Sequence, residues 1–168
     1  SDPRVAGKLF VALRASTEGG ADGGIAVVEN AAAGPVTVRS PIAGDFLEVR
    51  AHCASGIVWA GRELFIEPGD GAPDWIHENG LMRSTDGGAT FAAVTLNIDE
   101  PLAWRLRWVT AIGVDPMDPL TVIAVGKGGD VVSTRDGGAT WAVQNDTRHM
   151  SAKHFGAIVN DVEIGPAE

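Results

Sequence analysis

The side chains most capable of binding or transforming a ligand gather in two segments of the chain. The first segment, residues 67–79 with the sequence EPGDGAPDWIHEN, is long and polar and contains carboxylate, indole and imidazole groups. Its candidate functional residues are Asp74, Trp75 and His77. Long polar loops on a rigid scaffold often carry binding residues, which favours a functional role. The alternative is a solvated loop in which Trp75 covers the edge of a sheet.

The second segment, residues 104–108 with the sequence WRLRW, alternates between large apolar and cationic side chains. On a strand, Trp104 would share one face with Trp108, while Arg105 and Arg107 would share the other. Indole faces stack on sugar rings, and paired guanidinium groups bind carboxylate or phosphate. We therefore expect this segment to contact a ligand through Trp104, Arg105 and Arg107. The alternative is that the tryptophans pack between structural units and the arginines balance nearby carboxylates.

Carboxylates are the remaining candidates for chemistry, and we single out Asp74, Asp99 and Glu100. Hydrolysis of a glycosidic bond needs two carboxyl groups about 5–5.5 Å or about 6.5–9.5 Å apart. Asp99 and Glu100 are adjacent, so on a strand their side chains point in opposite directions. Since the sequence contains no complete catalytic set, it favours a non-catalytic protein over an enzyme.

No motif for metal, nucleotide or thiol chemistry accompanies these residues. The histidines lack the paired spacing of zinc sites, and the spacing of a calcium-binding EF-hand loop and the glycine-rich nucleotide motifs are absent. Cys53 has no disulfide partner in the chain and no catalytic signature around it. We therefore expect neither a metal nor a cofactor.

The composition excludes further function classes. The chain has 168 residues, 13 of them Lys or Arg and 22 Asp or Glu, with a formal charge of −9 and 45% apolar residues. An acidic chain is a poor partner for a nucleic-acid backbone, and no apolar run approaches the roughly 20 residues of a membrane span. We expect neither nucleic-acid binding nor a membrane span. Because the chain begins with Ser1, we expect it to follow a cleavage, a trimmed tag or an upstream segment.

An internal repeat indicates which elements position these side chains. STDGGATF at residues 84–91 recurs as TRDGGATW at residues 134–141. Asp, Ser and Thr side chains fold such turns by hydrogen-bonding nearby backbone, and the Gly pair supplies positive φ. The final aromatic residue then enters the next strand and packs inward. We assign a structural role to Ser84, Asp86, Gly88, Thr90, Phe91, Thr134, Asp136, Gly138, Thr140 and Trp141.

Both copies of this repeat, at residues 84–91 and residues 134–141, resemble the Asp-box, or BNR repeat, of sialidase-like β-propellers. Phe91 replaces Trp in the first copy. Families with such blades include sialidases, xyloglucan-hydrolysing glycosidases, sortilin-type receptors and a photosystem assembly factor. The resemblance implies box turns on the face opposite the active site, and therefore no catalytic role for Asp86 or Asp136. A sialidase would also need a Tyr–Glu pair, so a chain without Tyr is not a complete sialidase.

We therefore predict an all-β fold of about three four-stranded antiparallel propeller blades in one segment, residues 1–168. The blades are expected at residues 46–95, at residues 108–143, and at residues 7–40 together with residues 157–164. The N-terminal unit lacks an inner strand, and residues 157–164 resemble one. They would complete that unit in the same chain, in a second copy or in a longer chain. Since propellers typically have about 4–8 blades, we expect a homo-oligomer or part of a longer propeller.

The sequence favours a non-catalytic binding or scaffolding module that presents its loops to a glycan or protein partner. One alternative is a glycoside hydrolase, or a fragment of one, with carboxylates on the loop face. Another is a structural component of a large assembly such as a virion tail or surface fibre. An extracellular, virion or cell-surface location fits each of these functions.

Overall fold

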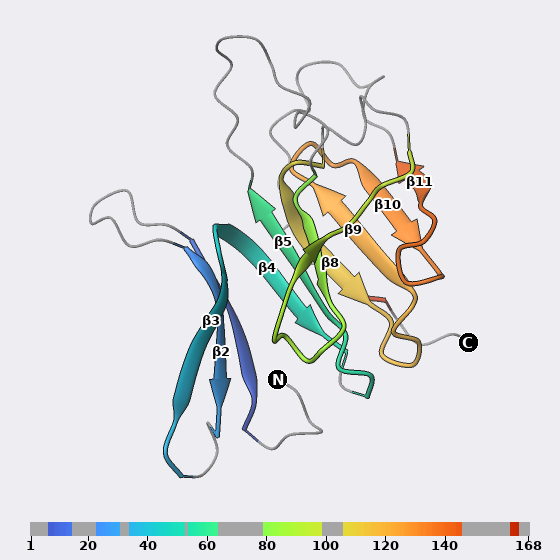
Figure 1. Cartoon of the computed structure of the whole chain (residues 1–168). Helices are drawn as coiled ribbons and strands as arrows, with labels where there is room; N and C mark the ends of the chain where they lie inside the picture. Colours follow the sequence, from blue (N-terminus) through green and yellow to red (C-terminus); the bar gives the residue numbers. More distant parts are fainter. Residues whose placement is uncertain are drawn as a thin grey trace, which may run out of the picture.

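The computed structural model describes residues 7–14, 23–30, 34–52, 54–63, 79–98, 106–145 and 162–164. Within these ranges the chain forms eleven strands and no helix, arranged in three antiparallel sheets (Figure 1). The prediction of an all-β fold built from antiparallel blades is confirmed. No helix long and apolar enough to cross a bilayer occurs in the described part of the chain.

The three sheets follow one another along the sequence. The first has the order β1-β2-β3, with bounds Leu9–Leu13, Gly24–Glu29 and Thr37–Ala43. The second has the order β4-β5-β6-β7, with bounds Asp45–Ala51, Val58–Glu63, Leu81–Ser84 and Ala92–Ala93. The third has the order β11-β10-β9-β8, and its strands in chain order are Val109–Val114, Val122–Gly126, Val131–Thr134 and Ala142–Asn145. Runs of β-branched residues bounded by Gly, Asp and Pro explain why these segments are short strands.

The strand ends define two edges of the molecule (Figure 1). At one edge, β5 and β9 end and β6 and β8 begin; we call this the loop edge. At the opposite edge lie residues 84–91 and 134–141, which we call the box turns. The box turns and the loop edge therefore lie at opposite ends of the strands.

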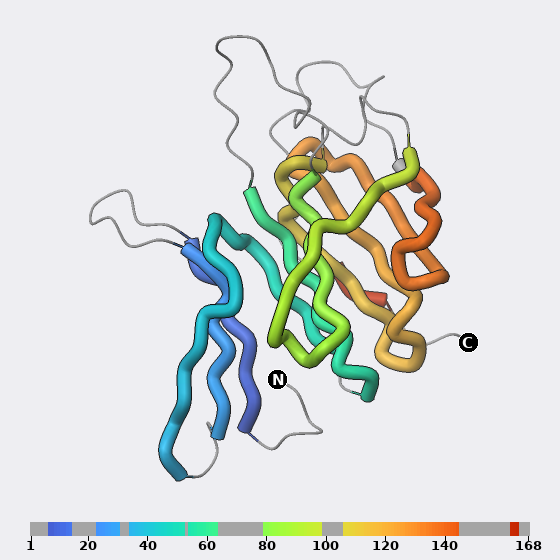
Figure 2. The backbone as a smooth tube through the Cα atoms, in the orientation of Figure 1, coloured from blue at the N-terminus to red at the C-terminus, as the bar shows by residue number. Residues whose placement is uncertain are grey.

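Neighbouring sheets pack face to face (Figure 2). Two hydrophobic cores lie between them. The first core contains Phe10, Ile25, Val27, Phe46, Val58, Ala60 and Met82. The second contains Trp59, Leu81, Leu96, Leu106, Val109, Ile112, Val122, Ala124, Val132 and Trp141. Each core joins two consecutive sheets, so the second sheet is covered on both of its faces.

The first and second sheets meet at the first box turn. Gly88 has a φ of +79°, and a Cβ on this residue would lie 2.4 Å from Cε1 of Phe10. Only glycine therefore allows the turn to approach the ring this closely. Lys8 and Arg39 each donate a hydrogen bond to a backbone carbonyl of the turn at 2.7 Å. Phe91, the last residue of the turn, packs against the same core.

The second and third sheets meet at the second box turn in the same way. Gly138 has a φ of +94°, and its Cβ would lie 3.2 Å from Cη2 of Trp59. Trp141 contacts Trp59 edge to face, with ring centroids 6.1 Å apart and an interplanar angle of 87°. Arg83 donates a hydrogen bond to a carbonyl of this turn, and its guanidinium lies 5.6 Å from the centre of the Trp59 ring. Phe10 and Trp59 therefore occupy equivalent positions in consecutive sheets.

Residues 162–164, the last described part of the chain, form no strand. They lie against β8, because a Cβ on Gly113 would be 3.1 Å from the Val162 carbonyl oxygen. Residues 157–161 lie outside the described residues. The assignment of residues 157–164 to the N-terminal unit therefore stays a prediction, as does the division into three blades.

Candidate ligand-binding edge

Arg107 is the only one of the predicted ligand-contacting residues that the described ranges include. The other predicted ligand contacts lie outside them: Trp75, His77, Trp104 and Arg105. The same holds for the predicted carboxylates Asp74, Asp99 and Glu100. These residues stay predictions, and Arg107 with its surroundings forms the described part of the loop edge.

Trp108 is the centre of a cluster at the start of β8. It forms an isolated antiparallel bridge with Glu63 at the end of β5. Its carbonyl accepts a hydrogen bond from the N–H of Lys127 at 2.9 Å. Trp108 is thus tied to the second sheet on one side and to the β9–β10 turn on the other.

Two glycines allow the second sheet to approach this segment closely. A Cβ on Gly80 would lie 2.7 Å from the Arg107 carbonyl oxygen, and one on Gly61 would lie 2.7 Å from the Val109 carbonyl oxygen. The Gly80 N–H also donates to the Leu106 carbonyl at 2.8 Å. Any larger residue at either glycine would push the start of β8 away from the second sheet.

Two cations lie beside the half-buried indole of Trp108. Nζ of Lys127 is 3.6 Å from the centre of the ring, and the Arg107 guanidinium carbon is 4.9 Å from it. At these distances the ring quadrupole attracts both charges. The cluster therefore presents N–H donors around an aromatic surface.

The alternating arrangement expected for residues 104–108 does not extend to the described part of this segment. Leu106 and Arg107 form a turn, and β8 begins only at Val109. Leu106 is fully buried in the second core, and its carbonyl accepts a hydrogen bond from the Gly80 N–H of the second sheet. As a result Arg107 lies beside the Trp108 ring and does not point to the opposite face of a strand.

An ion pair flanks the cluster. Arg14, which follows β1, donates from Nη2 to Oε2 of Glu63 at 2.9 Å. The Glu63 side chain is 8% exposed, whereas that of Arg14 is 63% exposed. The sequence reasoning missed Arg14, Glu63 and Lys127. The signal available in the sequence was the position of Lys127 in the short turn between β9 and β10.

At the opposite edge, groups of the first box turn donate hydrogen bonds to both carboxylate oxygens of Asp86. Oδ1 of Asp86 accepts hydrogen bonds from Ser84 Oγ at 2.7 Å and from the N–H groups of Ala89 and Thr90, each at 2.9 Å. Oδ2 accepts from Thr90 Oγ1 at 2.6 Å. The hydrogen bonds from Thr90, and then that from Ser84, hold the pKa of Asp86 far below its ordinary value.

The second box turn repeats this network. Oδ1 of Asp136 accepts from Thr134 Oγ1 at 2.7 Å and from the Thr140 N–H at 2.9 Å, while Oδ2 accepts from Thr140 Oγ1 at 2.5 Å. The hydrogen bonds from Thr140 are the largest cause of a strongly lowered pKa for Asp136. Both carboxylates are thus ionised acceptors within their own turns, an arrangement that stabilises the turns.

No group of three or more His, Cys, Asp or Glu side chains that could hold a metal ion occurs among the residues the structure describes. His52 is buried between two turns instead. Its Nδ1 lies 3.1 Å from Ser55 Oγ, and its Nε2 lies 3.1 Å from the Pro116 carbonyl oxygen. This histidine therefore connects the second sheet to the third.

No family model matches the sequence, and no curated protein matches it. Solved structures do share its fold. The GH74 enzyme of Niastella koreensis aligns with 86% of this chain and 21% of its own, with a TM-score of 0.54 and 14% identity. An ancestral GH74 enzyme aligns with 85% of this chain and 17% of its own, with a TM-score of 0.52 and 16% identity. YCF48 from Cyanidioschyzon merolae aligns with 82% of this chain and 37% of its own, with a TM-score of 0.45 and 17% identity.

The chain spans about a fifth of the length of each GH74 enzyme. At these identities the likeness concerns the fold, and the GH74 enzymes are β-propellers. Three antiparallel sheets packed face to face match part of such a ring. The chain has a β-propeller fold.

Proposed function

We propose that this chain is part of a non-catalytic β-propeller module that binds an anionic glycan at the loop edge. The observation that carries this proposal is the cluster around Trp108, with Lys127 at 3.6 Å and Arg107 at 4.9 Å from the ring centre. Ammonium and guanidinium groups donate charge-assisted hydrogen bonds to carboxylate oxygens. The partly exposed indole adds apolar surface for a sugar ring.

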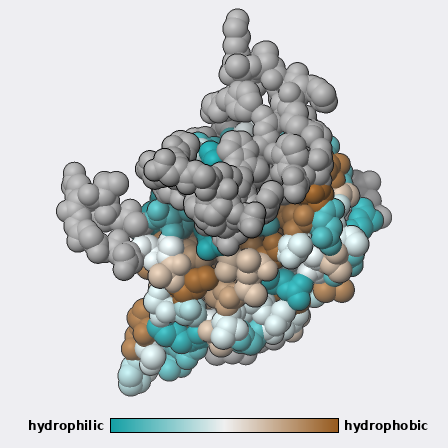
Figure 3. All heavy atoms as spheres, turned by 45° about the horizontal axis from the view of Figure 1, so that its top comes forward, coloured by the Kyte–Doolittle hydropathy of each residue, from teal (hydrophilic) through white to brown (hydrophobic). Residues whose placement is uncertain are grey.

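The surroundings of the cluster also fit a binding role. Trp108 is held by backbone contacts to Glu63 and Lys127, so its position does not depend on the ligand. Preorganised groups lose less conformational entropy on binding. Figure 3 shows the described surface coloured by hydropathy, with hydrophilic and hydrophobic side chains interspersed below the grey residues.

A glycoside hydrolase, or a fragment of one, is the second candidate. Its support is the fold likeness to two GH74 enzymes, of which this chain covers about a fifth. Asp74, Asp99 and Glu100 would then supply carboxyl groups at the loop edge. A hydrolase would require two of them at one of the separations that glycosidic chemistry uses.

Binding to an array of uronic-acid-containing and neutral glycans tests the first candidate. Arg107→Gln and Lys127→Gln should each weaken binding of an acidic glycan by roughly tenfold, the loss expected for one charge-assisted hydrogen bond. Arg135→Gln is the matched control, because this exposed arginine lies in a box turn at the opposite edge. It should leave binding unchanged.

Equal affinity of both loop-edge variants and the wild type for every bound glycan would contradict the proposal. Release of reducing sugar from the same glycans would favour the hydrolase. In that case Asp74→Asn, Asp99→Asn or Glu100→Gln should abolish the release.

A further inference from the structure

A groove lies between the outer strand of the second sheet and the second box turn. Its volume is about 500 Å³, and residues 90–95 line it without interruption, so the groove follows β7 and the chain on either side of that strand. Gly138 and Ala139 of the box turn line its other wall. Asn97 connects the two walls, because its Nδ2 donates to the Ala139 carbonyl at 3.3 Å. All the lining residues belong to the described part of the chain.

The groove is open because a small residue occupies the outer strand at this junction. In the second sheet Arg83 and Ala92 follow Trp59 in one row across the strands. In the first sheet the outermost position of the equivalent row holds Arg39, whose long side chain reaches the first box turn. Ala92 is exposed and has no side chain beyond Cβ, so the space over it is not filled from its own sheet.

Arg83 brings a positive charge to this groove. Its guanidinium donates to the Gly137 carbonyl and lies over the Trp59 ring, but it forms no ion pair with any described residue. At the first junction, by contrast, Nε of Arg39 lies 3.4 Å from Oε1 of Glu29. No Asp or Glu is among the described residues that line the groove. A half-buried guanidinium in this setting favours a carboxylate as its partner.

The carboxylates of the two box turns are engaged within their own turns. Thr90 donates to both oxygens of Asp86, and Thr140 donates to both oxygens of Asp136. Neither carboxylate forms an ion pair with Arg83. A carboxylate that pairs with Arg83 would therefore come from outside the described residues.

Strand β7 is also a free edge of the second sheet. It is the last strand in the order β4-β5-β6-β7, and no described segment pairs with its outer side. The Val94 N–H donates inward to the Leu81 carbonyl at 3.0 Å. Since alternate residues of such a strand bond to opposite sides, the backbone groups of the exposed residues Ala93 and Thr95 point outward. An extended peptide can pair with an edge of this kind.

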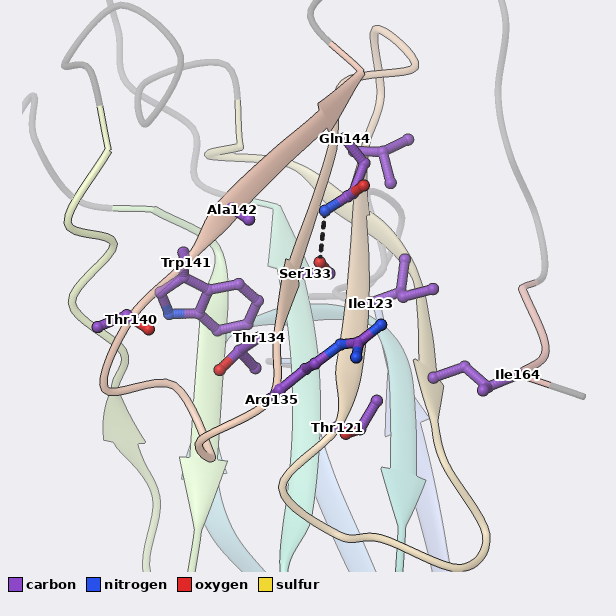
Figure 4. Close-up of a pocket in the computed structure, with 11 residues that line it drawn as sticks. Thr121, Ile123, Ser133, Thr134, Arg135, Thr140, Trp141, Ala142, Gln144 and Ile164 are labelled. Atoms are coloured by element: carbon purple, nitrogen blue, oxygen red, sulfur yellow. Dashed lines mark hydrogen bonds between the residues drawn. The ribbon is translucent and has the colours of Figure 1, made fainter. Parts of the chain in front are cut away.

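The described strands of the third sheet lack this combination (Figure 4). Their equivalent row runs from Ile123 through Ser133 to Ala142, so a hydroxyl group takes the place of the guanidinium. Ser133 Oγ accepts a hydrogen bond from Gln144 Nε2 at 2.8 Å. Ala142 is thus an exposed alanine on an outer strand without an arginine in its row.

We infer that the outer edge of β7 binds an extended peptide whose acidic side chain lies over Ala92 and pairs with Arg83. The peptide adds a strand to the second sheet through the outward backbone groups of Ala93 and Thr95. Residues opposite each other on neighbouring strands share a face, so the peptide residue opposite Ala92 points to the same side as Arg83. Because Ala92 is small, a Glu side chain at that position can cross it. This surface shares no residue with the cluster around Trp108.

Fluorescence anisotropy with a labelled, end-blocked peptide of sequence SVTVEVTVS tests the inference. A second peptide with Gln in place of the central Glu is the control ligand. The wild type should bind the Glu peptide at least about tenfold more tightly, the difference expected for a charge-assisted hydrogen bond. Arg83→Gln should remove this preference, with circular dichroism as the check that the variant is folded.

A second variant tests the groove without changing the charge. Ala92→Leu fills the space over β7 at an exposed position and should weaken binding of the Glu peptide at least about tenfold. Ala142→Leu is the matched control, because it makes the same change at the equivalent position of the third sheet, and it should leave binding unchanged.

Four results would overturn the inference. The first two are no binding of either peptide and equal binding of the Glu and Gln peptides by the wild type. The third is wild-type affinity of the Ala92→Leu variant for the Glu peptide. The fourth is competition by free glutarate at the same concentration as unlabelled Glu peptide, because it would show that the peptide backbone contributes nothing.

Discussion

The junction between the first and second sheets and the junction between the second and third sheets share one geometry but use different side chains. In both, a glycine of a box turn lies on an aromatic ring of the preceding sheet, and a cation from that sheet donates to a carbonyl of the turn. The rings are Phe10 and Phe91 in the first junction and Trp59 and Trp141 in the second. The aromatic rings differ in size between the two junctions, whereas a glycine occupies the equivalent position of the box turn in both.

This difference indicates which parts of the junction are interchangeable. Two cations, Lys8 and Arg39, donate to the first turn, whereas Arg83 donates to the second and also lies over Trp59. The cation that donates to the turn therefore comes from a different strand in each junction. The backbone of the turn has no such freedom, since its φ values and its close approach both require glycine.

The largest effect should come from removing the aromatic ring of the second junction. Trp59 is 0% exposed, so Trp59→Ala should lower the free energy of unfolding by about 3–5 kcal/mol. Phe10 is smaller and 9% exposed, so Phe10→Ala should cost less. Urea unfolding measures both. A larger loss for Phe10→Ala would show that the two junctions are not equivalent.

A side chain on the box-turn glycines should have the next largest effect. Gly88→Ala forces a residue at a φ of +79° against Phe10, and a residue in this region costs of order 1–3 kcal/mol. Gly138→Ala should cost less, because its Cβ would lie 3.2 Å from Trp59 and not 2.4 Å from a ring. The difference in melting temperature between the two variants measures this, and the reverse order would contradict the observed geometry.

Loss of the cations should have a smaller effect. Arg83→Met removes one charged hydrogen bond and a cation–π contact, so we expect a loss of about 1–2 kcal/mol. Arg39→Met should cost less, because Lys8 still donates to the same turn. Chemical denaturation of the two variants gives both values. Equal losses would indicate that Lys8 does not compensate.

The smallest of these effects should be the dependence of stability on pH that the box-turn carboxylates cause. Their pKa values are lowered in the folded state, so their contribution is present above the unfolded pKa of about 4 and is lost as the pH falls through the folded values. Melting temperature should therefore fall below about pH 4. In a variant with both Asp86→Asn and Asp136→Asn this dependence on pH should be weaker. An unchanged slope would mean that other carboxylates cause the acid sensitivity.

The all-β class could be predicted because its signals are local. β-Branched runs, glycine pairs and the repeated DGGAT sequence each specify a strand or a turn from a few neighbouring residues. The partners of those turns could not be predicted in this way. Phe10 and Gly88 are far apart in the sequence, and only the packing of the sheets brings them together.

The candidate site was less predictable than the fold. Alternation in residues 104–108 placed Arg107 on a face opposite Trp108, but the Gly80 N–H holds the Leu106 carbonyl and turns the chain. Lys127 reaches the same indole from a different hairpin. Residues from different hairpins meet at this indole because their strands end at the same edge. A local sequence pattern does not predict which strand ends lie side by side.

The central claim is that Trp141, the aromatic residue that ends the second box turn, packs on the Trp59 ring of the preceding sheet and so joins the two sheets. A double-mutant cycle with Trp59→Ala, Trp141→Ala and the double variant tests it most directly, with urea unfolding as the measurement. The edge-to-face contact at 6.1 Å predicts a coupling free energy of about 0.5–1.5 kcal/mol, so the double variant should lose less stability than the two single losses added together. Strict additivity of the two losses would contradict the claim.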